Sequence, residues 1–366
     1  MKFRQPILRV LIPLFLAPTL AFALTPDEQF LAARDAARTG DRAKLERLAP
    51  FLQGHELEAY VEYWQLLPDL KDSDPATVQA FLSRHENSYI AEKLRTDWLR
   101  QLARKQQWSL FDSEYPRLAQ ANQELACPAL QSRRAQGDPR VLDDALPLWL
   151  TLLEPPEPCY PVLEALIIDK RVLADAVWAR IRRQFEANKI AAALYSMNYL
   201  PSSQMPEKKL AQTVVDTPLP WLGRLPSDFS GNRAQRELAA LAIQRLARND
   251  PRMAADQLEK IGGSMKSGEK AWAWSQIGLQ AAQRHLPEAM EWYRQAGDAP
   301  LSDEAAEWKV RAALRVQDWG SVRASIERMP PELAAQPAWV YWLGRAYRAG
   351  GRMEDANTLF AKIAGQ

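Results

Sequence analysis

The sequence predicts an all-α fold, a superhelical solenoid of stacked helix pairs. Apolar residues recur at helical spacing, helix starts carry capping residues, and the later part of the chain repeats with a period near the ~34 residues of tetratricopeptide units. The spacing is clear at Tyr60, Tyr63, Trp64 and Leu67, which fall at i, i+3, i+4 and i+7. No convincing stretch alternates apolar and polar residues, so strands are not predicted.

Several predicted helices begin with an N-cap residue followed by proline. Thr25-Pro26 with Glu28 matches a capping box with proline at the first helical position. An acidic cap followed by proline recurs at Asp74-Pro75, Asp138-Pro139 and Asp250-Pro251. A cap carboxylate accepts hydrogen bonds from free backbone N–H groups and interacts favourably with the helix dipole, so we expect a helix at each place.

The repeat is visible in small or branched residues at one position of successive units. Ala255, Ala289, Val322 and Ala356 are 34, 33 and 34 positions apart. One unit cannot bury its apolar face alone, so neighbouring units are expected to stack and leave a concave surface. Residues 201–232 hold five prolines and two glycines. We interpret this segment as an irregular break in the array, with a domain boundary as the alternative.

The first 23 residues are typical of a secretory signal peptide. Lys2, Arg4 and Arg9 precede the apolar run 10–20, and Ala21-Phe22-Ala23 supplies the cleavage motif. Cleavage is predicted after Ala23, which leaves residues 24–366 as the α-helical domain in an oxidising compartment. The alternative is an uncleaved membrane anchor, although this run is short for a ~30 Å hydrocarbon layer.

The charge of the mature chain argues against a nucleic-acid partner. Of 47 basic residues, three lie in the signal peptide, so 44 remain against 45 acidic ones and the formal charge changes from +2 to −1. A near-neutral chain has no electrostatic footprint for phosphates. No later segment has 18 consecutive apolar residues, so no membrane span is predicted after cleavage.

The two cysteines predict a disulfide. Cys127 and Cys159 are 32 positions apart, and no third cysteine competes for either of them. An oxidising compartment favours their pairing. The alternative is two buried free thiols, and a catalytic thiol is not predicted.

No catalytic, cofactor-binding or metal-binding residue is predicted. The polar candidates are Asp69, Asp72 and Asp74, the pair Asp143 and Asp144, and the histidines His55, His85 and His285. The first group lacks the glycine and distal glutamate of an EF-hand. The histidines form no metal-ligand pair and no catalytic order with a serine and an aspartate. We interpret all of them as structural or solvated residues.

Aromatic and basic side chains are the remaining candidates for binding. Tryptophans are concentrated in the later half, at Trp272, Trp274, Trp292, Trp308, Trp319, Trp339 and Trp342. They could stack on sugar rings, but helical spacing favours a core role. A basic group consists of Lys170, Arg171, Arg180, Arg182 and Arg183. It could meet an anionic polymer, but a solvated helix face is the favoured interpretation.

Several segments in order resemble the N-terminal superhelical domain of the soluble lytic murein transglycosylases. They are Tyr60-Val61-Glu62-Tyr63-Trp64, Ala91-Glu92-Lys93-Leu94-Arg95 with Trp98-Leu99, Trp108 with Phe111, Leu125-Ala126-Cys127, Ala135-Gln136-Gly137, Leu148-Trp149-Leu150, Cys159, and Trp339-Val340-Tyr341-Trp342 with Ala346. The resemblance implies a periplasmic protein that acts on peptidoglycan. In that family a lysozyme-like domain cleaves glycan strands and leaves 1,6-anhydromuramoyl ends.

The resemblance does not extend to the family's catalytic motifs. The catalytic glutamate of the family lies in a Glu-Ser dipeptide, followed by Gly-Leu-Met-Gln, and neither occurs here. Gly278-Leu279-Gln280 is the nearest fragment, and Ala346-Tyr347-Arg348-Ala349-Gly350, which resembles a transglycosylase element, is interpreted as a repeat turn. We therefore expect a chain that lacks the C-terminal lysozyme-like catalytic domain, is inactive alone, and binds or positions murein.

Two other hypotheses remain open at this stage. The chain could be a non-enzymatic periplasmic scaffold that binds other cell-wall enzymes through its concave face. An unrecognised acidic pair could instead give it glycosidase activity.

Overall fold

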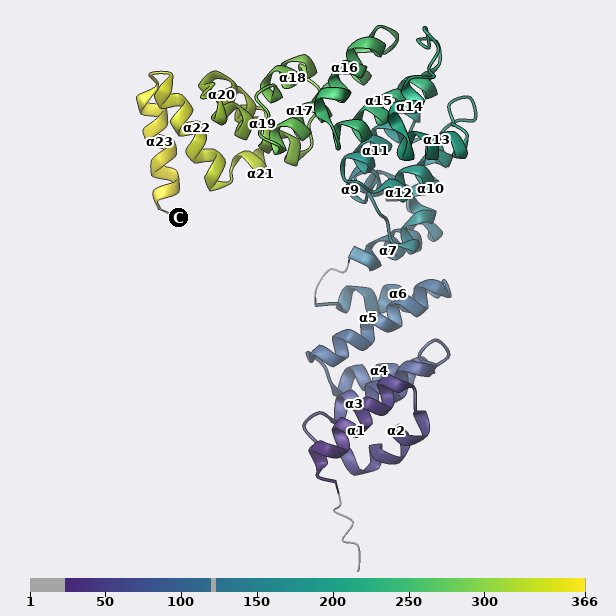
Figure 1. The fold of residues 1–366 in the computed structure, drawn as a ribbon. Helices are drawn as coiled ribbons and strands as arrows, with labels where there is room; N and C mark the ends of the chain where they lie inside the picture. Colours follow the sequence, from purple (N-terminus) through teal and green to yellow (C-terminus); the bar gives the residue numbers. More distant parts are fainter. Residues whose placement is uncertain (1–23, 120–122, 366) are drawn as a thin grey trace, which may run out of the picture. The chain divides into compact units, whose positions relative to one another are not determined.

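The computed structural model describes residues 24–119 and 123–365 and shows only helices, turns and loops among them (Figure 1). The predicted all-α class is therefore confirmed. The predicted signal peptide lies outside the described residues. The chain divides into two compact units, residues 1–132 and residues 133–366. Within the described ranges, no helix is both long and apolar enough to cross a membrane.

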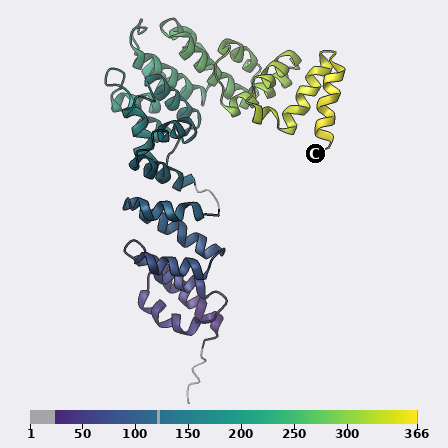
Figure 2. The same cartoon turned by 180° about the vertical axis from the view of Figure 1, so that it is seen from behind.

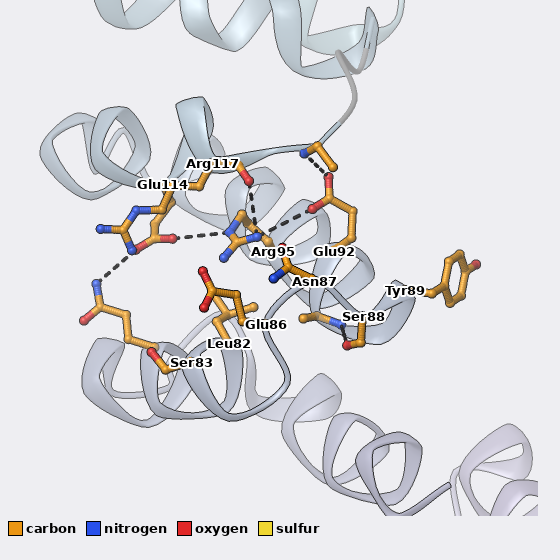
Figure 3. A pocket seen from close by; sticks show the side chains of 13 residues that line it. Leu82, Ser83, Glu86, Asn87, Ser88, Tyr89, Glu92, Arg95, Glu114 and Arg117 are labelled. Atoms are coloured by element: carbon orange, nitrogen blue, oxygen red, sulfur yellow. Dashed lines mark hydrogen bonds and ion pairs between the residues drawn. The ribbon is translucent and has the colours of Figure 1, made fainter. Parts of the chain in front are cut away.

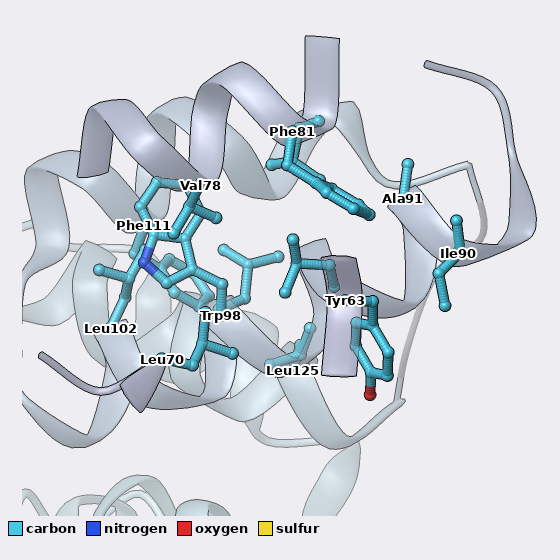
Figure 4. Close-up of a cluster of buried hydrophobic side chains, with 13 residues drawn as sticks. Tyr63, Leu70, Val78, Phe81, Ile90, Ala91, Trp98, Leu102, Phe111 and Leu125 are labelled. Carbon is cyan, nitrogen blue, oxygen red and sulfur yellow. The ribbon is translucent and has the colours of Figure 1, made fainter. Parts of the chain in front are cut away.

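The first unit is built around a cluster of buried aromatic and aliphatic side chains. Its helices are α1 (Pro26–Thr39), α2 (Arg42–Leu48), α3 (Glu58–Leu66), α4 (Pro75–Arg84), α5 (Tyr89–Arg104), α6 (Trp108–Glu114) and the start of α7 (Gln123–Ala135). Phe81, Trp98 and Phe111 meet in the cluster (Figure 4). They come from α4, α5 and α6, so burial of this cluster fixes how these three helices pack.

The second unit begins with seven α-helices, most of them short, and continues as a series of helical hairpins among the described residues. The first seven α-helices are α8 (Val141–Ala145), α9 (Leu148–Thr151), α10 (Tyr160–Ile168), α11 (Ala174–Glu186), α12 (Ile190–Ser196), α13 (Lys208–Asp216) and α14 (Pro218–Leu222). The hairpins pair α15 (Arg233–Ala247) with α16 (Pro251–Ile261), α17 (Ser267–Gln283) with α18 (Ala289–Ala296), α19 (Asp303–Arg315) with α20 (Trp319–Glu327), and α22 (Pro337–Ala349) with α23 (Met353–Ala364). The last pair lies side by side in both views (Figure 2).

These four hairpins are the units that the sequence period predicts. Ala255, Ala289, Val322 and Ala356 all lie in the second helix of a hairpin, and all four are buried. A small residue there lets the second helix approach the first closely. Short α21 (Pro331–Ala334) lies in the connection between the last two hairpins.

Three of the four predicted caps are confirmed. Thr25 and Glu28 exchange the two hydrogen bonds of a capping box, and Asp74 and Asp250 each accept a backbone N–H in the first turn that follows. The prediction at Asp138-Pro139 is wrong, because α8 begins only at Val141. Asp138 instead closes a turn by accepting the Arg140 N–H at 2.9 Å. This bond, together with Arg133, lowers the pKa of the Asp138 carboxyl.

The segment 201–232 contains two short helices as well as irregular chain. Pro218 stands at the first position of α14, where a missing N–H costs nothing. Val214, Trp221 and Leu222 are buried, and both α13 and α14 pack against α15. The prolines of this segment therefore bound short helices that cover the first hairpin of the array.

Candidate functional site

Both cysteines are buried and disulfide-bonded, as the sequence predicts. Neither sulfur is a thiol in this structure, so the cysteines contribute a cross-link and no nucleophile.

The five aspartates considered as candidates form ion pairs or cap a helix. Asp69 pairs with Arg42 at 2.5 Å, Asp72 pairs with Lys105 at 2.8 Å, and Asp74 caps α4. The other two aspartates are also paired, in the contacts Asp143–Arg171 at 2.8 Å and Asp144–Arg133 at 2.6 Å. In the described part of the chain, no group of three or more His, Cys, Asp or Glu side chains could hold a metal ion.

The three histidines pack against aromatic rings. The His55 ring stacks on Phe30 at 5.2 Å between centroids, and the His85 ring lies 4.6 Å from that of Phe81. His285 lies 6.1 Å from the ring of Trp308. The predicted structural role therefore holds for His55 and His85, whereas His285 lines a cavity between α17 and α19.

The sequence predicts that the basic group forms a solvated helix face, and this prediction is wrong for Arg180. Its side chain is only 1% exposed, and its guanidinium donates to the carbonyl oxygens of Trp149 and Leu152 and lies 4.9 Å from the Trp149 ring. Burial lowers the pKa of this guanidinium. Arg182 is partly buried, whereas Lys170, Arg171 and Arg183 are exposed. Arg180 thus donates hydrogen bonds to carbonyl groups at the end of α9 that lack helical partners. The basic residues around it in the sequence do not indicate this role.

The tryptophans divide into a buried set and a partly exposed set. Trp272, Trp274, Trp292 and Trp339 are buried, which confirms the core interpretation for them. Trp308, Trp319 and Trp342 keep part of their surface exposed. Rings that remain available for a ligand are therefore found on α19, α20 and α22.

Three carboxylates lie where α11, α15 and α17 pack together, and none was singled out from the sequence. Those of Glu237 and Glu269 are buried, and that of Glu186 is partly buried. The Glu237 carboxylate accepts two hydrogen bonds from Arg182, at 2.9 and 2.6 Å, and the Glu269 carboxylate accepts from Arg236 Nε at 3.0 Å. Glu186 accepts from Trp272 Nε1 at 2.8 Å and from Gln276 Nε2 at 2.6 Å. Each carboxylate is held by donors from a neighbouring helix, so these acids connect the helices to one another.

The Glu186 carboxyl predicts how the stability of the protein changes with pH. Burial raises the pKa of this carboxyl above its ordinary value of 4.5. The folded state therefore retains the proton to higher pH than the unfolded chain, and stability falls as the pH rises through this interval. Glu186→Gln keeps an oxygen acceptor for Trp272 without the charge. We expect its thermal unfolding midpoint to exceed that of the wild type at pH 7.

The difference between variant and wild type is expected to shrink as the pH is lowered below 4.5, where both states are protonated. Glu259→Gln, at an exposed position of α16, is the matched control and should follow the wild-type profile. A Glu186→Gln midpoint below that of the wild type at pH 7 would show that the charge is stabilising and would contradict the prediction.

A cavity of about 620 Å³ lies in the first unit, at the turn between α4 and α5 (Figure 3). Its lining is Gln79, Leu82, Ser83, Glu86, Asn87, Ser88, Tyr89, Ala91, Glu92, Arg95, Glu114, Arg117 and Ala119. Asn87 has a left-handed backbone with φ 63°, a conformation that asparagine tolerates well. We call this the Glu114 cavity.

Four charged side chains in the wall of the Glu114 cavity form a network of ion pairs. The Glu114 side chain is 1% exposed and contacts Arg95 at 3.4 Å and Arg117 at 3.5 Å. Glu92 pairs with Arg95 at 3.5 Å and accepts the Ala119 N–H at 2.9 Å. These four side chains pair with one another, and Glu86 adds a further carboxylate to the lining. The wall has no paired nucleophile and base, so the arrangement suits binding better than catalysis.

Fold and site together define a class: an all-α protein of stacked helical hairpins with a cavity lined by polar and charged side chains. No family model matches the chain. Over 333 residues it is 22% identical to the soluble lytic murein transglycosylase of Escherichia coli K12, covering 88% of this chain and 50% of the relative. The Salmonella typhimurium protein of the same name is 22% identical over 330 residues, covering 86% and 49%.

Solved structures give the same result. The lytic transglycosylase Slt of Pseudomonas aeruginosa, solved as an inactive mutant, matches with a TM-score of 0.61 and 27% identity, over 92% of this chain and 55% of that one. The 70-kDa soluble lytic transglycosylase of E. coli shares the fold, with a TM-score of 0.51 and 20% identity over 93% and 56%. The resemblance to the soluble lytic murein transglycosylases is therefore confirmed, and the chain spans about half the length of these relatives.

Proposed function

We propose that this protein takes part in murein turnover in the periplasm as the helical, murein-holding part of a lytic transglycosylase system. The carrying observation is the similarity to the soluble lytic murein transglycosylases, which runs along 88% of the chain in sequence and 92% in structure. The disulfide and the signal-like residues 1–23 support export.

Within this function, residues 24–366 bind or position glycan strands, and bond cleavage is supplied by other residues. The absence of the Glu-Ser and Gly-Leu-Met-Gln motifs from the sequence supports this division. So do the contacts of three carboxylates at the α11, α15 and α17 packing, since Glu186, Glu237 and Glu269 are each held by donors of a neighbouring helix. A general acid for glycoside cleavage needs an open cleft beside the reacting bond.

The test is co-sedimentation of the mature protein with purified murein sacculi. We expect the protein in the pellet with sacculi and in the supernatant without them. Chitin particles, which are neutral and carry no peptide, are the matched control and should retain less protein. The supernatant should contain no soluble 1,6-anhydromuropeptides.

Two results would contradict the proposal. If the protein remains in the supernatant in the presence of sacculi, it does not hold murein. Cell-wall enzymes that co-purify with it would then favour the scaffold function. Release of 1,6-anhydromuropeptides would place a catalytic acid within residues 24–366.

A further inference from the structure

Another cavity, of about 570 Å³, lies among α20, α22 and α23 in the last part of the array. It is lined by Trp319, Tyr341, Arg345, Arg348, Ala349 and Phe360, with no acidic side chain in the wall. We call it the Arg345 cavity. Its volume is within the roughly 300–1,000 Å³ typical of small-ligand sites.

Aromatic rings hold the guanidinium of Arg345 in place. Its central carbon lies 5.8 Å from the centroid of the Trp319 ring and 5.9 Å from those of Tyr341 and Trp342. Arg345 also donates from a terminal nitrogen to the Tyr341 hydroxyl at 2.9 Å. A cation is attracted to ring faces. A side chain that is already held loses less conformational entropy when a ligand binds.

Arg345 and Arg348 have no carboxylate partner among the residues that the structure describes. Arginines nearby in the sequence do have one, since Arg352 pairs with Asp355 at 2.7 Å and Arg311 pairs with Glu307 at 3.0 Å. The Arg345 cavity therefore carries an uncompensated positive charge. Arginine donors match a carboxylate in a bidentate geometry.

The Glu114 cavity differs in this respect. Its arginines, Arg95 and Arg117, already face the carboxylates of Glu92 and Glu114. An anionic ligand would have to displace a protein carboxylate there, whereas the Arg345 cavity offers free donors. Tyr341 is also 37% exposed, which leaves ring surface for the apolar face of a sugar.

We propose that the Arg345 cavity binds a saccharide unit that bears a free carboxylate, with the sugar on the aromatic wall and the carboxylate on Arg345 and Arg348. This inference rests on the proposed murein-holding function and assigns one binding site within it. The required ligand combines a ring that has an apolar face with an anionic group. A neutral sugar would contact only the aromatic wall, and a bare anion would contact only the two arginines.

The test measures binding of N-acetylmuramoyl-L-alanyl-D-isoglutamine, a muramoyl dipeptide with one free carboxylate, by titration calorimetry. Arg345→Gln is expected to weaken binding roughly tenfold or more, because a charge-assisted pair is lost. The wild type should bind the amidated ligand, in which the carboxylate is neutral, more weakly by a similar factor. The sugar-free dipeptide should also bind more weakly, since it leaves the rings uncovered.

Arg104→Gln is the matched control, because Arg104 is an exposed arginine at the end of α5, in the other unit. It should bind the muramoyl dipeptide as the wild type does, and all variants should keep the wild-type unfolding midpoint. Equal affinity of Arg345→Gln and wild type, equal affinity for acid and amide, or no binding by the wild type would each overturn the proposal.

Sacculi separate this inference from the function on which it rests. If the wild type pellets with sacculi and Arg345→Gln pellets equally well, with unchanged dipeptide affinity, murein holding stands and the site is wrong. If the wild type itself does not pellet, the murein-holding function fails.

Discussion

Removing the disulfide with Cys127→Ala/Cys159→Ala is expected to lower the free energy of unfolding by about 3–4 kcal/mol at 25 °C. The bond closes a loop between cysteines 32 positions apart, and both are disulfide-bonded in the structure. In the chain-entropy model, opening this loop gives the unfolded chain more conformations to occupy. Urea denaturation, followed by circular dichroism, measures the change.

Reduction of the wild-type protein distinguishes the free energy contributed by the disulfide from that contributed by packing of the cysteine side chains. Both cysteines are buried, so alanine also leaves small cavities in the core. Reduced wild type keeps both sulfur atoms and should lose most of the same free energy. Cys127→Ala alone should behave like the double variant, because Cys159 then has no partner. A reduced wild type that unfolds at the same urea concentration as the oxidised protein would contradict the prediction.

The sequence predicts the local features of this fold well. Helical periodicity, caps such as Thr25 and Asp250, and the position of Ala289 and Ala356 depend on residues close together in one hairpin. Such features are encoded over short distances, and the structure confirms them. The two cysteines could also be paired because no third one competes.

Contacts between distant residues were not predictable in the same way. Arg180 reaches the carbonyl groups of Trp149 and Leu152, about thirty positions earlier, and nothing in its own helix indicates this. The Arg345 cavity likewise needs rings from α20, α22 and α23 to meet. One signal was available: Arg236 and Glu269 are 33 positions apart, close to the repeat period, and lie in the first helices of adjacent hairpins.

Arg236→Met is expected to destabilise the protein by about 3–5 kcal/mol, the usual cost of removing one partner from a buried ion pair. The Arg236 and Glu269 side chains are only 4% and 7% exposed, and Arg236 also donates to the Ser230 carbonyl. Methionine fills similar space but leaves the carboxylate without its cation. Urea denaturation at pH 7 measures the loss.

Adding Glu269→Gln to Arg236→Met distinguishes an uncompensated charge from lost packing. Glutamine keeps an oxygen to accept the Lys266 N–H at the start of α17, now 2.9 Å from the carboxylate. The double variant should regain about 1 kcal/mol or more over Arg236→Met, because no buried charge remains. A double variant less stable than Arg236→Met would mean that the Glu269 carboxylate in Arg236→Met is already solvated or paired elsewhere. In that case, packing of the Arg236 side-chain stem links α15 to α17.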